Sequence, residues 1–280
     1  MNIIPRLAAV HDISGFGKCS LTVVLPILSA MGIEVCPLPT AVLSTHTGGF
    51  GDYTFLDMTD DMPKIIDHWK SLDIKFDAIY SGFLGSPRQV DILIDFIEKS
   101  KHDKFLTIVD PVMGDHGKLY STMTDEMVEK MRKLVANATV ITPNFTEAAL
   151  LLGEECVSGA VSDDLVFDWA KRLSDLGAPQ VVITSVMSDD NEMYVIIYDK
   201  QTGAAKKVHC KYTQGVFHGT GDTFTSVLSA RLLHGGSLET AAQSAADFVS
   251  AAIAETVKYP SITTRDGILF EKVLARKREL

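Results

Sequence analysis

The sequence predicts an α/β protein with three layers, in which a mostly parallel central sheet is covered by helices on both faces. Short runs of apolar and β-branched residues recur along the 280 residues, and helical segments lie between most of them. Strands that are apolar throughout and alternate with helices are typical of parallel sheets buried on both sides. The predicted strands are Leu7–Val10, Ile33–Leu38, Ala78–Ser81, Leu106–Val112, Thr139–Thr142, Gln180–Thr184 and Met193–Tyr198.

The predicted helices are delimited by ordinary start and stop signals. Gly32 follows the first helix and Gly177 the fourth, because glycine readily takes the backbone conformation that ends a helix. Ser237 is a suitable N-cap for the last one. The predicted helices are Leu21–Met31, Pro87–Lys99, Asp125–Val135, Asp163–Leu176, Asp222–Leu233 and Leu238 to about Glu255. No repeat or linker interrupts this pattern, so we expect a single domain over residues 1–280.

The composition favours a small-molecule ligand. The formal net charge of −10 would repel both the phosphate backbone of nucleic acids and anionic lipid. The first residues lack a long apolar run and are interrupted by Pro5 and Arg6, so we expect no signal peptide, no membrane span and a cytoplasmic location. The four cysteines show no C-x-x-C spacing, which argues against a zinc site and a disulfide framework.

Polar residues follow the ends of nearly all the predicted strands. The first five strands lead into the segments HDISGFGKCS, TAVLSTHTGGF, GFLGS, DPVMGDHGKLY and PNFTEAALL, and the sixth ends in TS. In open α/β sheets, ligands bind beyond the carboxyl ends of the strands. We therefore expect an active site at this edge of the sheet.

The segment GFGKCS does not form a standard nucleotide-binding loop. A Walker A motif would need a glycine at position 12 and a serine or threonine at position 19, where the sequence has Asp12 and Cys19. The dinucleotide fingerprint fails as well, because Ser20 occupies the position of its last glycine. The segment is either a turn that lines a substrate pocket or a purely structural connection between strand and helix.

Three acidic residues near strand ends suggest a magnesium site. Asp110 ends a predicted strand, Asp115 lies on the loop beyond it, and Glu147 follows the next strand. Mg²⁺ prefers oxygen ligands and often bridges one or two carboxylates to substrate phosphates. Taken singly, each acid is typical of a solvated loop or helix cap, and Glu147 has the spacing of an exposed glutamate in a first helical turn.

The segment HGTGDTF, residues 218–224, combines a glycine-rich turn with a carboxylate where a helix begins. The N-terminus of a helix attracts anions, so the turn could bind a phosphate and Asp222 could accept a proton beside it. Aspartate is also a common N-cap, and for the motif in isolation that simpler interpretation stands.

The motifs together resemble the ribokinase superfamily. HGTGDTF, DPVMGD, ITPNFTEAALL and STHTGG occur in the order found in the pyridoxal, pyridoxine and pyridoxamine kinases and the related hydroxymethylpyrimidine kinases. The resemblance extends from Ala8 to about Ala254 and implies a ribokinase-like fold. It also implies that Asp222 deprotonates the attacking hydroxyl, and that the turn forms an anion hole for the transferred phosphoryl group. The anion-hole residues are Gly219, Thr220 and Gly221.

The same resemblance assigns the remaining candidate site residues. It implies that Asp110, Asp115 and Glu147 organise Mg²⁺. The residues implied to line the nucleotide phosphates are Thr142, Asn144 and Thr184, and those implied to face the substrate ring are Asp12, His46, Thr47 and Phe83. Pyridoxal kinases commonly have a serine near Asp12 and a tyrosine in place of Phe83, so a hydrogen bond to the substrate is lost or replaced.

The resemblance implies an ATP-dependent kinase that phosphorylates the 5-hydroxymethyl group of a vitamin B6 vitamer, and a homodimer. The alternative is hydroxymethylpyrimidine kinase activity, because an aspartate after the first strand also occurs in that branch. A ligand sensor without catalysis is a more remote alternative, since binding alone does not require the base Asp222. ATP and Mg²⁺ are the expected phosphoryl donor and metal.

Overall fold

The central sheet has nine strands. The structure, a computed structural model, describes residues 3–156, 159–188, 192–211, 215 and 217–277. The strands of the sheet are β1 (Arg6–Ser14), β2 (Glu34–Leu43), β3 (Phe55–Asp57), β4 (Ala78–Ser81), β5 (Leu106–Val109), β8 (Val140–Ile141), β9 (Gln180–Met187), β10 (Met193–Asp199) and β11 (Ala204–His209). Their order across the nine-stranded sheet is β11-β10-β9-β8-β5-β4-β1-β2-β3, while β6 (Gly114–Asp115) and β7 (Lys118–Leu119) form a separate hairpin.

The strand directions bring many loops to one edge of the sheet. Every neighbouring pair from β9 to β2 is parallel, whereas β10, β11 and β3 extend the two sides of the sheet in antiparallel fashion. The carboxyl ends of the parallel strands therefore open at the same edge. The prediction of a mostly parallel sheet is confirmed.

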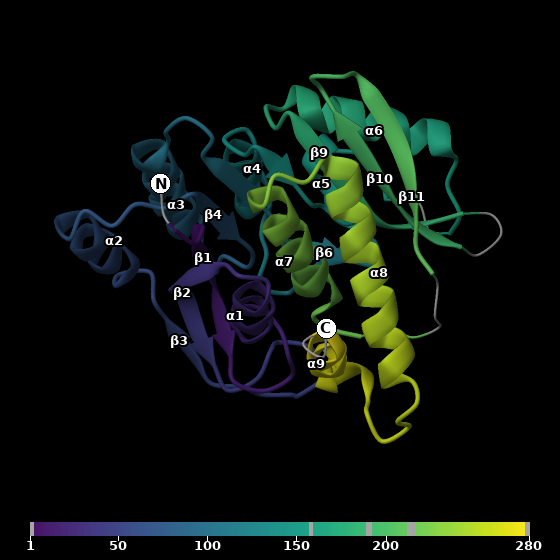
Figure 1. Cartoon of the computed structure of the whole chain (residues 1–280), viewed down its shortest axis with the longest axis horizontal. Helices are drawn as coiled ribbons and strands as arrows, with labels where there is room; N and C mark the ends of the chain where they lie inside the picture. Colours follow the sequence, from purple (N-terminus) through teal and green to yellow (C-terminus); the bar gives the residue numbers. More distant parts are fainter. Residues whose placement is uncertain (1–2, 157–158, 189–191, 212–214, 216, 278–280) are drawn as a thin grey trace.

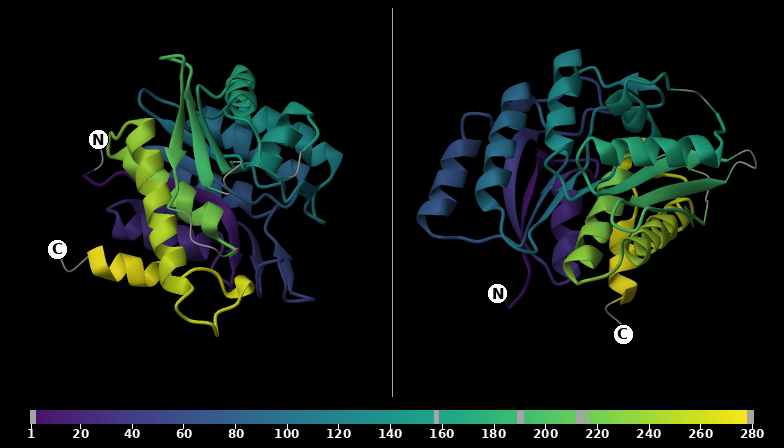
Figure 2. Two further views of the ribbon diagram at one scale, coloured as in Figure 1. Left: turned by 90° about the vertical axis from the view of Figure 1, so that its right-hand side faces the viewer. Right: turned by 90° about the horizontal axis from the view of Figure 1, so that it is seen from above.

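Helices cover both faces of this sheet (Figures 1 and 2). One layer contains α1 (Leu21–Ala30), α7 (Thr220–Leu233) and α8 (Leu238–Thr256), with α9 (Phe270–Lys277) packed against α8. The other contains α2 (Met62–Ser71), α3 (Pro87–Ser100), α4 (Asp125–Val135), α5 (Phe145–Leu152) and α6 (Asp163–Asp175). Alternate residues of β1 divide between the two cores: Leu7 and Ala9 pack on the α1 side, and Ala8 and Val10 on the opposite side.

The helix starts follow from local hydrogen bonding. The N-cap side chains of α3, α4, α6 and α8 each accept a hydrogen bond from a backbone N–H in the first turn; these residues are Ser86, Thr124, Ser162 and Ser237. At α5, the Asn144 side chain and the Glu147 side chain bond reciprocally to each other's backbone N–H. The start of α5 is therefore fixed, and with it the loop that follows β8.

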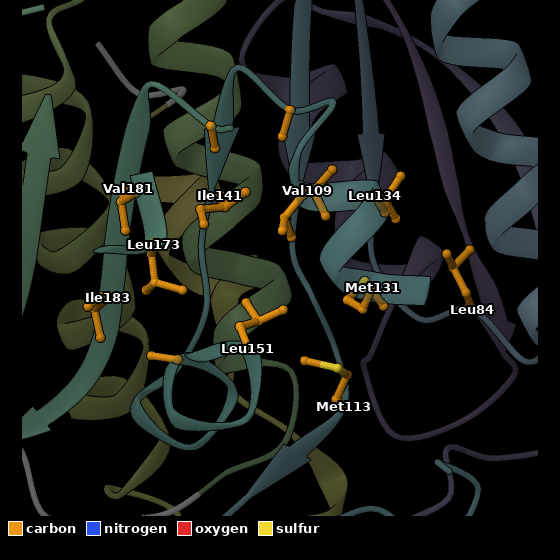
Figure 3. Packing of buried hydrophobic residues seen from close by; sticks show 14 of the residues in the cluster. Leu84, Val109, Met113, Met131, Leu134, Ile141, Leu151, Leu173, Val181 and Ile183 are labelled. Atoms are coloured by element: carbon orange, nitrogen blue, oxygen red, sulfur yellow. The ribbon is translucent and has the colours of Figure 1, made fainter. Parts of the chain in front are cut away.

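The larger hydrophobic core lies between the sheet and the helices α3 to α6 (Figure 3). Val109, Ile141 and Val181 of three neighbouring strands face side chains of α4, α5 and α6, and Phe145 stacks on Trp169 at 4.8 Å between ring centroids. Met113, labelled with them in Figure 3, is fully buried in the same core. The loop after β5 is thus anchored by an apolar side chain between its two acidic residues, Asp110 and Asp115.

Most predicted elements are present, with shifted ends. The strands β3 and β11, the hairpin β6–β7 and the helix α2 were not predicted, whereas α5 begins where the sequence placed Glu147 in a first helical turn. β5 stops at Val109, so Asp110 begins a loop, and α7 begins at Thr220, two residues before the predicted start. Within the described residues, no helix combines the length and apolarity needed to cross a lipid bilayer.

We predict that Gly177→Ala destabilises the protein more than Gly235→Ala. Both glycines have positive φ angles, 142° and 81°, so alanine is strained at either position by ~1–2 kcal/mol. A Cβ at Gly177 would also lie 2.7 Å from the Cα and carbonyl oxygen of Ala136, whereas none of the described atoms is within 4 Å at Gly235. Chemical denaturation should show a loss of roughly 3 kcal/mol or more for Gly177→Ala. Equal losses for the two variants would contradict the packing argument.

Candidate active site

Two adjoining cavities open at the carboxyl ends of the parallel strands. The first, of about 340 Å³, is lined by the end of β1, by the loops after β1, β2, β4, β5 and β8, by part of β9 and by the start of α7. The second, of about 640 Å³, is more apolar and lies between β9, β10, α5 and α8, with Val195, Val249 and Ile253 among its walls. Residues that border both cavities mark their junction; these are Asp115, Thr184, Ser185, Phe217, Thr220, Gly221 and Phe224.

The glycine-rich turn forms this junction. Gly219 is the N-cap of α7 with a φ angle of 77°, and a side chain there would collide with the carbonyl oxygen of Lys18. Thr220 and Gly221 follow as the first two residues of the helix, where backbone N–H groups lack partners within the helix. The positive end of α7 is therefore presented between the two cavities, as an anion site would require.

Asp222 is not the N-cap of α7. It is the third residue of the helix, and its carboxylate oxygen Oδ2 accepts a hydrogen bond of 2.8 Å from the backbone N–H of Ser20. The capping interpretation of HGTGDTF is therefore wrong, because the cap position belongs to Gly219. The side chain of Asp222 borders the first cavity.

The surroundings of Asp222 raise its pKa to about 6. Burial is the largest cause, because it disfavours the charged form, and the negative charge of Asp12 adds to it. The hydrogen bond from Ser20 N–H acts in the opposite direction. A carboxylate with such a pKa is largely ionised at neutral pH and remains a better proton acceptor than an ordinary aspartate.

Asp12 is a buried acid at the floor of the first cavity. Its side chain is held by two serine hydroxyls: Ser14 Oγ donates to Oδ2 at 2.8 Å and Ser20 Oγ donates to Oδ1 at 2.5 Å. Burial raises the pKa of Asp12, while these two hydrogen bonds lower it. Its orientation is thus fixed before any ligand enters.

His46 uses both ring nitrogens within the protein. Nδ1 accepts a hydrogen bond from Gly48 N–H at 3.1 Å, so the proton lies on Nε2, which donates to the carbonyl oxygen of Arg265 at 2.8 Å. The ring packs against Phe50, and against His218 at 4.5 Å between centroids. His46 borders the first cavity, but what it offers there is the surface of its ring.

A short segment near the C-terminus, residues 263–268, joins three loops around the first cavity; we call it the C-terminal strap. Besides the bond from His46, its Thr264 carbonyl accepts from His218 N–H at 3.2 Å and its Ile268 carbonyl accepts from Lys18 Nζ at 3.2 Å. The loops after β1 and β2 and the segment before α7 are therefore held by one stretch of backbone.

The other two residues predicted to face a substrate ring also border the first cavity. Thr47 is exposed on the loop after β2, and Phe83 is half-buried directly after β4. The backbone carbonyl of Phe83 accepts a hydrogen bond of 3.0 Å from the hydroxyl of Thr40. The four residues Asp12, His46, Thr47 and Phe83 thus lie around one cavity, on three different strand ends.

Asp110 and Glu147 are buried side by side behind the junction. Burial, followed by the charges of Glu147 and Asp222, raises the pKa of Asp110 well above its usual range, and hydrogen bonds from Thr142 and Thr225 oppose this. Burial likewise raises the pKa of Glu147 to about 8, although its two oxygens accept backbone N–H bonds from Met113 at 3.0 Å and Asn144 at 2.8 Å. The expectation that Glu147 taken singly is an exposed first-turn glutamate is wrong, because it folds back onto the loop after β5.

Asp115 is exposed and borders both cavities. Its Oδ1 accepts a hydrogen bond of 2.8 Å from His116 N–H. Within the described part of the chain, no three His, Cys, Asp or Glu side chains converge to form a complete metal site. Five acids nevertheless border the first cavity, and its described lining contains no lysine or arginine; the acids are Asp12, Asp110, Asp115, Glu147 and Asp222. A hard cation held partly by a ligand's own oxygens fits such a donor set.

The three residues predicted to line nucleotide phosphates lie at different depths. Thr184 borders both cavities, beside Asn144 on the neighbouring chain segment. Asn144 donates from Nδ2 to the carbonyl of Gly114 at 2.8 Å, and Thr142 accepts from the hydroxyl of Thr225 at 3.0 Å. Only Thr184 of the three borders the second cavity.

Sequence reasoning missed the partners of Asp12 and most of the second cavity. Ser14 and Ser20 stand in the segment HDISGFGKCS, but nothing in their spacing shows that both hydroxyls turn to one carboxylate. No sequence motif marks the apolar wall of the second cavity. Its residues Val195, Val249 and Ile253 are ordinary apolar positions of β10 and α8.

Comparison with known proteins supports one family. Residues 27–264 match the family of phosphomethylpyrimidine kinases. A crystal structure with pyridoxal, of a Bacteroides thetaiotaomicron protein described as a phosphomethylpyrimidine kinase, is 48% identical with a TM-score of 0.93 and covers 98% of this chain and 95% of that one. Pyridoxal kinase from Lactobacillus plantarum is 31% identical with a TM-score of 0.88 and covers 99% of both chains.

A curated relative agrees with these structures. The pyridoxine/pyridoxal/pyridoxamine kinase of Bordetella avium is 33% identical over 86% of this chain and 82% of its own length. The chain therefore belongs to the phosphomethylpyrimidine kinase family, in the ribokinase superfamily that its motifs resemble.

Proposed function

We propose that this protein is an ATP-dependent kinase that phosphorylates the 5-hydroxymethyl group of a vitamin B6 vitamer. The observation that carries the proposal is the position of the turn Gly219–Asp222 between a polar cavity and a larger apolar one. A phosphoryl transfer between two bound molecules needs an anion site and a proton acceptor at such a junction. The pyridoxal in the crystal structure of the Bacteroides thetaiotaomicron relative supports a B6 vitamer as the acceptor.

In this proposal the first cavity binds the alcohol. Asp222 accepts the proton of the hydroxymethyl group while its oxygen attacks the γ-phosphorus, and ADP leaves. The N–H groups at the start of α7 stabilise the charge on the transferred phosphoryl oxygens. Asp12 and Thr47 offer polar atoms to the ring, and Phe83 an apolar surface.

The second cavity suits the nucleoside part of ATP. Its walls include Phe145, Val195 and Ile253, which provide an apolar site for a flat base, and Lys211 is present at the same cavity. Thr184, Asp115 and the turn at the junction lie where the phosphates pass from this cavity to the first.

We propose Mg²⁺ as the metal, with Asp110 and Asp115 as its carboxylates and Glu147 as the support of the loop that carries both. When bound, Mg²⁺ neutralises phosphate charge during the transfer. The chain itself gathers acids and no described lysine or arginine around the first cavity, so a polyphosphate brought there requires a cation.

Hydroxymethylpyrimidine kinase activity is the second candidate. The family as a whole is described as phosphomethylpyrimidine kinase, and both acceptors are flat nitrogenous rings with a primary alcohol. A sensor without catalysis is the third, and the base Asp222 with its pKa near neutrality speaks against it.

We further propose that the chain works as one kinase domain, as a homodimer and in the cytoplasm. Apolar side chains exposed at Phe55 and Leu56 on the edge strand β3 offer a surface that a second copy could cover. Among the described residues no disulfide joins any of the four cysteines, which suits a reducing compartment.

The test of function is a coupled assay of ADP formation with five acceptors in parallel: pyridoxal, pyridoxine, pyridoxamine, 4-amino-5-hydroxymethyl-2-methylpyrimidine and ribose. The proposal expects the highest kcat/KM for one of the three vitamers. Preference for the aminopyrimidine would transfer the assignment to the second candidate, and ATP turnover with none of the five would favour the sensor.

We predict that Asp222→Asn lowers kcat by roughly 10²–10⁴-fold, because asparagine cannot accept the proton. The amide oxygen can still accept the hydrogen bond from Ser20 N–H. The folded-state pKa of Asp222 lies above that of an unfolded chain, so its ionisation costs stability at neutral pH and the variant should melt at the same or a higher temperature. A fully active variant would remove Asp222 from the chemistry.

We predict that single-turnover phosphorylation slows as the pH falls through about 6. Asp222 has a pKa raised to about 6 and acts in its deprotonated form, so acid removes the active species. The rate should fall about tenfold per pH unit below this value. Asp222→Asn is the control, since the pH dependence of its residual rate should reflect only the titration of the substrates. Identical pH–rate profiles in both proteins would refute the assignment of Asp222 as the base.

We predict that excess chelator abolishes turnover and that Mg²⁺ restores it, because the candidate ligands are carboxylate oxygens. Asp115→Asn should raise the Mg²⁺ concentration needed for half-maximal rate without lowering the melting temperature, since this side chain is exposed. Asp164→Asn, on the exposed first turn of α6, is the matched control. Full activity in chelator would be inconsistent with a metal-dependent site.

We predict that Asp12→Asn raises KM for the alcohol while KM for ATP is unchanged, because Asp12 borders only the first cavity. Ile253→Ala is the reciprocal control: this residue borders only the second cavity and should raise KM for ATP. Parallel changes of both constants in either variant would mean that the two cavities do not bind separate substrates.

A further inference from the structure

Ser20 forms hydrogen bonds to both Asp12, which borders the proposed alcohol site, and Asp222, the proposed base. We propose that Ser20 is a positioning residue, whose hydroxyl anchors it to Asp12 so that its backbone N–H holds the carboxylate of Asp222 in place for catalysis. This inference rests on the proposed kinase function and adds to it a residue that borders the first cavity and acts on the reaction through Asp222.

The two hydrogen bonds run in opposite directions from Ser20. Its Oγ donates to Asp12 Oδ1 at 2.5 Å, and its backbone N–H donates to Asp222 Oδ2 at 2.8 Å. Ser20 is only 6% exposed, so the protein shields both bonds from most of the solvent. No hydrogen bond from the described residues reaches the other oxygen of Asp222, Oδ1, which leaves that atom for a substrate proton.

The backbone of Ser20 has a conformation that L-residues avoid. Its φ and ψ angles are 55° and −133°, a combination normally taken by glycine. Such strain persists only where surrounding contacts enforce it, and it gathers at functional sites. Here the conformation is what directs the N–H of Ser20 towards a residue that lies 202 positions further along the chain.

Ser20 also gives up an ordinary role. It is the N-cap residue of α1, and serine at this position usually accepts a hydrogen bond from a backbone N–H in the first turn. Its side chain makes no such bond, because the hydroxyl is turned to Asp12. Ser20 therefore combines a strained backbone with the loss of its side-chain capping bond. Both are costs to stability, and its hydrogen bonds to Asp12 and Asp222 are what this arrangement makes possible.

Ser14 provides a matched control in the same cavity. Its hydroxyl donates to Asp12 at 2.8 Å, as the hydroxyl of Ser20 does, but to the other oxygen, Oδ2. Only Ser20 also bonds to Asp222. Removal of either hydroxyl weakens the hold on Asp12, whereas only a change at residue 20 can displace the base.

The experiment compares Ser20→Ala, Ser20→Gly and Ser14→Ala, measuring kcat, both KM values and the melting temperature. Alanine lacks the anchoring hydroxyl and relaxes from the strained conformation, so kcat should fall by roughly tenfold or more as part of the base's contribution is lost. Glycine also lacks the hydroxyl but takes the conformation without strain, so Ser20→Gly should lose less kcat than Ser20→Ala. Ser20→Gly and Ser14→Ala should both raise KM for the alcohol, and KM for ATP should not change in any variant.

A second measurement tests whether Ser20→Ala lowers kcat through the displacement of Asp222. In the Asp222→Asn background, adding Ser20→Ala should leave kcat nearly unchanged, because there is no base left to misplace. Ser20→Ala with the kcat of the wild type, equal kcat losses in Ser20→Ala and Ser20→Gly, or an equal kcat loss in Ser14→Ala would each overturn the inference. A wild-type protein that turns over none of the acceptors would refute the proposed function instead.

Discussion

The electrostatic balance at the start of α7 governs this structure. The helix presents its positive N-terminus to the junction of two cavities, while acids from several strand ends surround the same opening. The N–H groups attract an anion, but the acids repel it, so neither feature alone would make a phosphate site. The two become compatible when a divalent cation accompanies the phosphates. Burial raises the pKa of both Asp110 and Asp222, and neighbouring negative charges add to it: Glu147 and Asp222 for Asp110, and Asp12 for Asp222.

The rest of the fold serves to hold these opposing charges at fixed positions. Parallel strands bring the loops to one edge, and the apolar core beneath them includes Met113 from the loop that carries Asp110. The capping pair Asn144 and Glu147 ties that loop to α5 through backbone hydrogen bonds. On the other side, the C-terminal strap fixes the loops after β1 and β2. Rigid support of this kind is what a site needs when its groups repel one another.

The sequence allowed the fold to be predicted where its signals are local. Apolar runs located the central strands, and serine and glycine located helix ends such as Ser237 and Gly177. β3, with only three residues, and β11, with the polar sequence AAKKVH, lack an apolar run and were missed. The glycine-rich turn was recognised, although α7 begins at Thr220 because Gly219, rather than Asp222, can take the left-handed cap conformation. Bonds such as Ser20 to Asp222, or His46 to Arg265, join residues about 200 positions apart and leave no local pattern.

The C-terminal strap has a consequence for how the protein is made. A ribosome releases the chain from its N-terminus, so Asp12, His46 and the sheet edge they occupy emerge long before residues 263–268. Until those residues appear, the carbonyl groups that accept hydrogen bonds from His46 and from Lys18 are missing. A nascent chain can therefore assemble its sheet while its substrate site stays unfinished. The backbone that holds the loops after β1 and β2 is therefore added only after every strand of the sheet has been made.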